Sequence, residues 1–266
     1  MKRIAECFKS LRSEGKKGLV TFVTAGDPNL ESTLDFMRAL VRGGTNIIEL
    51  GVPFSDPMAD GPTIQRSSER ALSAGTDLKS IFRIVERFRE RDKETPVVLM
   101  GYVNPFEKMG FKKFASDASR VGVDGVLVVD LPPDESWTQN AALRATGIDQ
   151  VFLVAPNSST SRVKKIGKLA SGFVYFVSVK GVTGDKTIAA DSIRDQVAAV
   201  RASTELPIGL GFGIKTPNNA REAANMSDAI VVGSALVEII EENRDAKKTE
   251  DLLERFVREI RGAIDE

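Results

Sequence analysis

The chain has 266 residues, of which 42% are hydrophobic and 28% are charged, and its 37 basic residues balance its 37 acidic ones. This composition is ordinary for a soluble globular protein, and a net charge of zero argues against a broad surface for nucleic acid or an anionic membrane. The chain contains no histidine, which excludes histidine-based zinc sites and Ser-His or Cys-His catalytic pairs.

The first residues carry no targeting signal that we can identify. Residues 1–15 have scattered charges and no apolar core, unlike a signal peptide. No apolar run approaches the length needed to cross a bilayer. Cys7 is the only cysteine and cannot form an internal disulfide, which suits a reducing compartment. We therefore expect a cytoplasmic protein with no membrane segment.

Eight short apolar runs alternate with amphipathic segments along the chain. The runs are rich in Val, Ile and Leu and lack polar alternation, as expected for parallel strands covered on both faces. Between them, apolar residues recur at helical spacing, for example over 78–88 and 252–260. We predict strands at Leu19–Val23, Ile47–Val52, Val97–Tyr102, Gly125–Val129, Val151–Val154, Val174–Val177, Ile208–Leu210 and Ala229–Val232.

The junctions between these segments favour a barrel. Gly44, Gly122 and Gly147 each precede a predicted strand, where a glycine can take the left-handed conformation that ends a helix. Eight strands with helical crossovers and no linker predict an α/β protein, a single (β/α)8 TIM barrel over residues 1–266 with extra N-terminal and C-terminal helices. The alternative is an open doubly wound sheet, whose dinucleotide-binding form needs a G-x-G-x-x-G motif that is absent after the first strand.

An acidic residue, Glu49, interrupts the second apolar run. A lone acid in an apolar strand costs several kcal/mol unless it is paired or neutral. Active sites of barrels lie at the C-terminal ends of the strands, so Glu49 in the barrel mouth would have a raised pKa and could act as acid and base near neutral pH. The alternative is a structural acid that a buried Arg or Lys satisfies.

Two further carboxylates follow in the loop after this strand. Asp56 stands beside Pro57 and Asp60 beside Gly61, so each also suits a turn. Glu49, Asp56 and Asp60 together are a possible metal site, since hard cations prefer carboxylate oxygens. Without histidine to complete a transition-metal set, we favour acid–base chemistry by Glu49 and Asp60 and predict no metal.

Glycines after the last two predicted strands indicate a phosphate site. Gly211, Phe212 and Gly213 follow the seventh strand, and Gly233 and Ser234 follow the eighth and lead into a helix. Glycine lets backbone N–H groups approach an anion, and the N-terminus of a helix adds partial positive charge. Barrels frequently build phosphate sites from these two loops. A third glycine pair, in the polar segment 181–186, is typical of a lid.

The segment Ile-Glu-Leu-Gly-Val-Pro-Phe-Ser-Asp-Pro-Met-Ala-Asp-Gly at 48–61 closely resembles the signature of the tryptophan synthase alpha chain family. The resemblance covers almost the whole chain, and one departure is Val129, where the family often has proline. It continues in order through segments 24–28, 99–105, 130–133, 181–184, 211–213 and 233–234. The resemblance implies a (β/α)8 barrel and a cofactor-free carbon–carbon lyase of tryptophan biosynthesis, which cleaves indole-3-glycerol phosphate to indole and glyceraldehyde 3-phosphate.

The resemblance also implies roles for individual residues. Glu49 would protonate the indole ring at C3 and assist loss of the side-chain hydroxyl proton, while Asp60 would accept a hydrogen bond from the indole N–H. Thr183 matches a lid residue that closes toward Asp60. The expected substrate-binding residues are Phe22, Met100, Leu127 and Tyr175 around the indole, for which plain core packing is the alternative, and Gly184, Gly211, Phe212, Gly213, Gly233 and Ser234 around the phosphate.

In this family the alpha chain works with a beta chain that uses pyridoxal phosphate and receives indole through a tunnel. The resemblance therefore implies a beta-chain partner in a tetramer of two alpha and two beta chains, with Pro53, Asp56, Pro57 and Asn104 at the interface. Two alternatives are a stand-alone indole-releasing lyase and a non-catalytic subunit that activates the beta chain. A metal-dependent sugar-phosphate epimerase is a weaker alternative.

Overall fold

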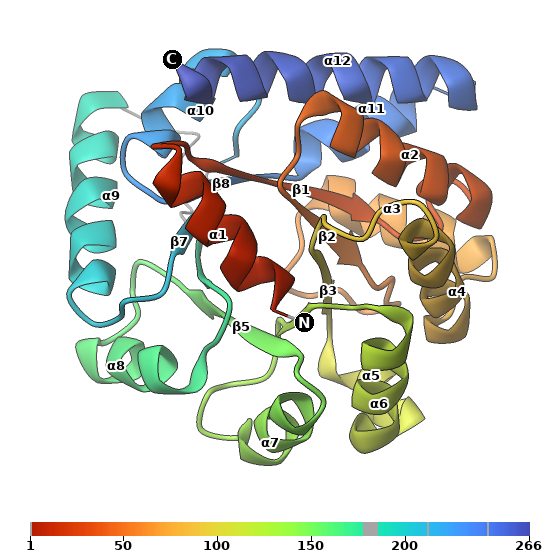
Figure 1. Ribbon diagram of the computed structural model, residues 1–266, viewed down its shortest axis with the longest axis horizontal. Helices are drawn as coiled ribbons and strands as arrows, with labels where there is room; N and C mark the ends of the chain where they lie inside the picture. Colours follow the sequence, from red (N-terminus) through yellow and green to blue (C-terminus); the bar gives the residue numbers. More distant parts are fainter. Residues whose placement is uncertain (1, 178–185, 212, 244) are drawn as a thin grey trace.

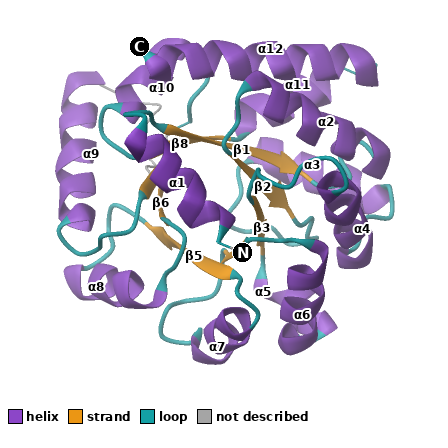
Figure 2. Cartoon of the chain, viewed as in Figure 1, coloured by secondary structure: helices purple, strands orange, loops and turns teal. Residues whose placement is uncertain are grey.

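The computed structural model describes residues 2–177, 186–211, 213–243 and 245–266. Eight parallel strands pair in chain order, and the eighth pairs with the first, so the sheet closes into a barrel (Figures 1 and 2). The closed sheet confirms the barrel prediction and excludes the open doubly wound alternative. The strands are β1 (Gly18–Thr24), β2 (Ile47–Gly51), β3 (Val97–Gly101), β4 (Gly125–Val128), β5 (Asp149–Val154), β6 (Val174–Val177), β7 (Ile208–Gly211) and β8 (Ala229–Val232).

All eight apolar runs form strands, and the only bound that differs by two residues is the start of β5 at Asp149. Gly44 and Gly122 end their helices with φ angles of 103° and 95°, as predicted for this junction. The helices are α1 (Arg3–Ser13), α2 (Leu30–Gly43), α3 (Pro62–Ser73), α4 (Leu78–Arg89), α5 (Val103–Met109), α6 (Phe111–Val121), α7 (Trp137–Ala145), α8 (Thr160–Leu169), α9 (Lys186–Arg201), α10 (Pro217–Ala224), α11 (Ser234–Glu242) and α12 (Ala246–Asp265).

The extra terminal helices are present as predicted. Figure 1 shows α1 lying across the ring of strands, while the other helices surround it and α12 runs along the outside next to α2. Ile4, Phe8 and Leu11 of α1 pack against the inward-facing side chains of the strands, such as Val20 and Val98. Because α1 precedes β1 and covers the N-terminal ends of the strands, the C-terminal ends are left to form a site.

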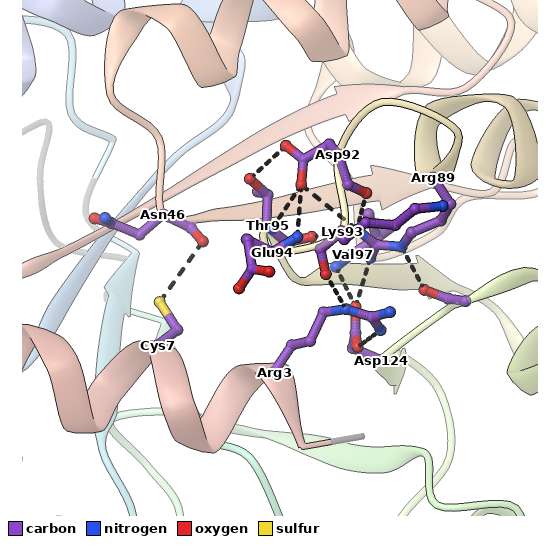
Figure 3. A network of polar contacts seen from close by, with 11 residues as sticks. Arg3, Cys7, Asn46, Arg89, Asp92, Lys93, Glu94, Thr95, Val97 and Asp124 are labelled. Atoms are coloured by element: carbon purple, nitrogen blue, oxygen red, sulfur yellow. Dashed lines mark hydrogen bonds and ion pairs between the residues drawn. The ribbon is translucent and has the colours of Figure 1, made fainter.

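A buried ionic network ties α1 and α4 to the same end of the barrel (Figure 3). Asp124, just before β4, accepts hydrogen bonds from Arg89 and from Arg3 at 2.7 Å each, and from the backbone N–H of Val97 at 2.9 Å. Arg89 also donates to the carbonyl oxygen of Thr95 at 2.7 Å. This network lies at the N-terminal ends of β3 and β4, where barrel residues serve stability.

Within the described ranges, no helix has the length and hydropathy that would let it span a membrane.

Candidate active site

A cavity of about 800 Å³ opens at the C-terminal ends of the strands. Every strand contributes a lining residue from its middle, from its last positions or from the residue that follows it, for example Phe22 of β1, Met100 of β3 and Val231 of β8. The two catalytic candidates, Glu49 and Asp60, both line this cavity. A cavity of this size and position is the usual place for a substrate in a barrel.

Glu49 lies in the middle of β2 and points into the barrel mouth. Side chains alternate along a strand, so Ile48 and Leu50 pack into the helix layer while Glu49 faces inward. Glu49 is fully buried, and neither of its carboxyl oxygens has a hydrogen-bond partner among the described residues. Burial raises its pKa from 4.5 to about 8. The alternative of an acid satisfied by a buried basic partner is therefore not supported.

Asp60 occupies the loop between β2 and α3, in a different environment. The hydroxyl of Tyr102 donates a hydrogen bond to Oδ2 of Asp60 at 3.0 Å and accepts one from the backbone N–H of Ala59 at 2.9 Å. Burial raises the pKa of Asp60, and the hydrogen bond from Tyr102 lowers it part of the way back. The cavity thus holds one carboxyl group without a partner and one that a donor stabilises in its charged form.

The wall between these carboxyl groups is largely apolar. Of the four residues expected around the indole, Phe22, Met100 and Tyr175 line the cavity, whereas Leu127 is fully buried among the interior side chains that pack near α1. Glycine makes room for one of the rings, because a Cβ atom on Gly211 would lie 2.8 Å from the ring of Tyr175. Burial, then the charges of Glu49 and Asp60, raises the pKa of Tyr175.

Sequence reasoning missed several lining residues. The apolar ones are Ile64, Val129, Leu153, Val177, Ile214 and Val231, and two basic side chains, Arg162 and Lys215, lie at the same cavity. Val129, Leu153, Val177 and Val231 share the inward parity of Glu49 at the ends of their strands, so alternation could have found them. The two basic residues lie in or before helices, and the pattern of apolar runs gives no signal for them.

The last two strands present backbone groups to the cavity. Gly213, Gly233 and Ser234 line it, together with Gly211 at the end of β7. Gly233 caps the N-terminus of α11 without a side-chain hydrogen bond, so the first N–H groups of the helix have no intrahelical acceptor. Such a terminus attracts anions. The other predicted binding residues, Thr183, Gly184 and Phe212, lie outside the described residues.

The sequence model of the tryptophan synthase alpha chain family matches residues 8–264. The chain belongs to this family. It is 51% identical over 265 residues to the alpha chain of Paraburkholderia phymatum and 52% to that of Burkholderia pseudomallei, with 100% of this chain and 97% of each relative covered. The crystal structure of tryptophan synthase subunit alpha from Legionella pneumophila is similar with a TM-score of 0.93 and 39% identity, covering 100% of this chain and 99% of that one.

The resemblance extends to structures of tryptophan synthase complexes. A tryptophan synthase chain from M. tuberculosis, in an aminoacrylate-bound form, has a TM-score of 0.88 and 31% identity, covering 99% of this chain and 100% of that chain. A chain of the tryptophan synthase complex from Pyrococcus furiosus has a TM-score of 0.83 and 40% identity, covering 93% and 99%. The family predicted from segment 48–61 is therefore confirmed.

The four residues that the family resemblance assigns to an interface lie outside the cavity wall of this alpha chain. Asp56 and Asn104 are exposed, Pro57 is half-buried and Pro53 is buried. Next to them Met58 is 84% exposed, which is unusual for a large apolar side chain. Among the described residues, no group of three acidic or cysteine side chains lies close enough to hold a metal ion, so Glu49, Asp56 and Asp60 do not form one.

Proposed function

We propose that this alpha chain is a lyase that cleaves indole-3-glycerol phosphate to indole and glyceraldehyde 3-phosphate by a retro-aldol reaction. The observation that carries this proposal is Glu49, a buried carboxyl group with a pKa of about 8 in a cavity that also holds Asp60. At neutral pH such a group carries a proton that it can give to a substrate, and it then becomes a base.

The proposed steps follow from the two carboxyl groups. Glu49 donates its proton to C3 of the indole ring, and Asp60 accepts a hydrogen bond from the indole N–H, which stabilises the positive charge that develops on the ring. The carboxylate of Glu49 then takes the proton of the side-chain hydroxyl. The bond between C3 and the side chain breaks, its electron pair returns to the ring as indole forms, and the hydroxyl-bearing carbon becomes the aldehyde.

The two ends of the substrate would occupy different walls. Phe22, Met100 and Tyr175 would enclose the indole ring, and the N–H groups at Gly213 and Gly233 would bind the phosphate with Ser234. We extend the phosphate site to Gly184, Gly211 and Phe212, and we assign to Thr183 closure toward Asp60, on the family resemblance alone.

We also propose a partner. The family and the similarity to chains of tryptophan synthase complexes support a beta chain, in a tetramer of two alpha and two beta chains, docked at Pro53, Asp56, Pro57 and Asn104. This chain would need no cofactor of its own, and pyridoxal phosphate would belong to the beta chain. The lone cysteine suits a reducing compartment, so we propose that the reaction takes place in the cytoplasm.

Release of indole tests the proposal. Indole should form slowly from indole-3-glycerol phosphate with this chain alone, much faster when a beta chain is added, and at the same rate with a chelator. Full activity without the beta chain would indicate a stand-alone lyase. No activity in either case would leave only a subunit that activates the beta chain, and loss with the chelator would contradict a metal-free reaction.

Substitution of Glu49 tests the proton transfer. Glu49→Gln should abolish indole release but keep affinity for glycerol 3-phosphate, since the amide cannot donate a catalytic proton and lies away from the phosphate wall. Glu94→Gln is a matched control, because Glu94 is an exposed acid next to β3 at the opposite end of the barrel. If Glu49→Gln keeps more than about a tenth of the rate, another group transfers the proton.

A further inference from the structure

Among the described residues, Tyr102 alone donates a hydrogen bond to the carboxyl group of Asp60, and it does not itself line the 800 Å³ cavity. It follows β3 directly and is only 3% exposed. Its single hydroxyl serves two consecutive residues of the loop after β2, as donor to Asp60 and as acceptor from Ala59. Its ring packs on Phe54 of the same loop, with the ring centres 5.3 Å apart.

These contacts constrain both the position and the charge of the Asp60 carboxyl group. A hydroxyl that is already held by the Ala59 N–H has its proton directed at Asp60, which fixes the rotation of the carboxyl group. A donor also favours the ionised form, whereas burial disfavours it. The same cavity also holds Glu49 and Tyr175, whose ionised forms would repel a charge on Asp60, and Arg162 and Lys215, whose positive charges would favour it. The hydrogen bond from Tyr102 is the described contact made directly to the carboxyl group, and it favours the charged form.

Burial and the nearby carboxylates favour the protonated form of Tyr102 itself. Burial, together with the carboxylates of Asp60 and Asp130, raises the pKa of Tyr102 above its ordinary value. The carboxyl group of Asp130 accepts a hydrogen bond from the N–H of Val103, the residue after Tyr102, at 2.7 Å. Tyr102 therefore remains a donor throughout the pH range in which Asp60 titrates.

We propose that Tyr102 is a positioning residue, which directs the Asp60 carboxylate to the substrate and keeps it ionised. This inference rests on the proposed function, in which a charged Asp60 accepts the indole N–H. Tyr102 does not touch the reacting atoms, so its effect should be visible in the pH dependence that Asp60 controls. A purely structural role would change stability without moving that dependence.

The first test is Tyr102→Phe, which keeps the ring and removes the hydroxyl. Without its donor, the pKa of Asp60 rises. The acidic limb of the pH profile, where kcat/KM for indole release falls because Asp60 becomes protonated, should therefore move about one unit to higher pH. Affinity for glycerol 3-phosphate should not change. Phe54→Leu is the control: it removes the ring contact but keeps the hydrogen bond, and it should leave the acidic limb in place.

A second measurement uses the fact that the chain has only two tyrosines, Tyr102 and Tyr175. Replacing both with 3-fluorotyrosine makes the phenol more acidic and a stronger donor, so the acidic limb should move to lower pH. The Tyr102→Phe variant made with 3-fluorotyrosine carries the fluorine at position 175 alone, so it measures the effect of fluorinated Tyr175 on the acidic limb separately. If Tyr102→Phe does not fold, the wild-type chain made with 3-fluorotyrosine still tests the positioning role.

The outcomes separate this inference from the proposed function. A wild-type chain that releases no indole contradicts the function itself. An active wild type whose acidic limb stays in place in both Tyr102→Phe and the fluorotyrosine protein contradicts the positioning role alone. Movement of the limb in opposite directions, with unchanged affinity for glycerol 3-phosphate, supports it.

Discussion

Replacing Glu49 by glutamine should stabilise the folded chain progressively more as pH rises. In the folded chain, burial raises the pKa of Glu49 to about 8, whereas the ordinary value is 4.5. Between these two values the unfolded chain has lost the proton and the folded chain still holds it. With respect to Glu49, the free energy of unfolding is therefore highest below pH 4.5, and it falls as the pH rises to about 8. Glutamine does not titrate and escapes this loss.

The size of the effect follows from the difference between the two pKa values. One pH unit corresponds to about 1.4 kcal/mol, so ionising the unfolded chain costs the wild type about 5 kcal/mol of stability by pH 8 and about 3 kcal/mol by pH 7. The amide of glutamine is also buried without a known partner, which changes the difference in free energy of unfolding by the same amount at every pH. The slope with pH is therefore the quantity that tests the burial of Glu49.

Urea unfolding at 25 °C and fixed ionic strength measures this slope. The free energy of unfolding of Glu49→Gln minus that of the wild type should rise by about 1.4 kcal/mol per pH unit between pH 5 and 8 and then level off. Glu94→Gln, at an exposed site, should show no such slope. A difference that is constant from pH 5 to 8 would mean that Glu49 has an ordinary pKa, and the assignment of a proton-donating acid would lose its basis.

Three further outcomes are expected. The alkaline limb of kcat/KM for indole release should lie near pH 8, because Glu49 must be protonated to act as an acid; a limb above pH 9.5 would exclude it. Gly211→Ala should reduce kcat/KM about tenfold or more, since its Cβ atom displaces the ring of Tyr175, while circular dichroism stays unchanged; full activity would show that the ring position is unimportant. Arg89→Met should lower the free energy of urea unfolding by about 3 kcal/mol, because it leaves buried Asp124 with one cation fewer, and a loss below about 1 kcal/mol would assign the network little weight.

Most of the fold could be predicted because its signal is local. Each strand is a continuous apolar run, since both faces of a parallel barrel strand are covered. Gly44 and Gly122 mark the ends of helices through a conformation that other residues rarely adopt. The predicted start of β5 is two residues too late, because Asp149 and Gln150 are polar although both belong to the strand.

The site was harder to predict because it depends on depth in the barrel. The alternation of side chains along a strand allows Glu49 to point either into the barrel mouth or into the helix layer. Only the closed sheet decides between these two directions. Leu127 has inward parity too, but it lies one layer deeper than Val129, which reaches the cavity. Strand tilt and stagger set this depth, and they are not written in the spacing of apolar residues.

Contacts between loops gave no sequence signal at all. Tyr102 reaches Asp60 across 42 residues, because the loop after β2 folds over the end of β3. Arg162 approaches the same cavity from α8. Such contacts depend on the path of each loop, which the residue types alone do not fix.

The most direct test of the proposed reaction is to run it in deuterium oxide. If Glu49 delivers a solvent-derived proton to C3, every indole released from indole-3-glycerol phosphate should carry one deuterium at C3, detectable by mass spectrometry and proton NMR, and Glu49→Gln should release none. Indole with hydrogen at C3, or deuterated indole formed by Glu49→Gln at the wild-type rate, would contradict protonation of the ring by Glu49.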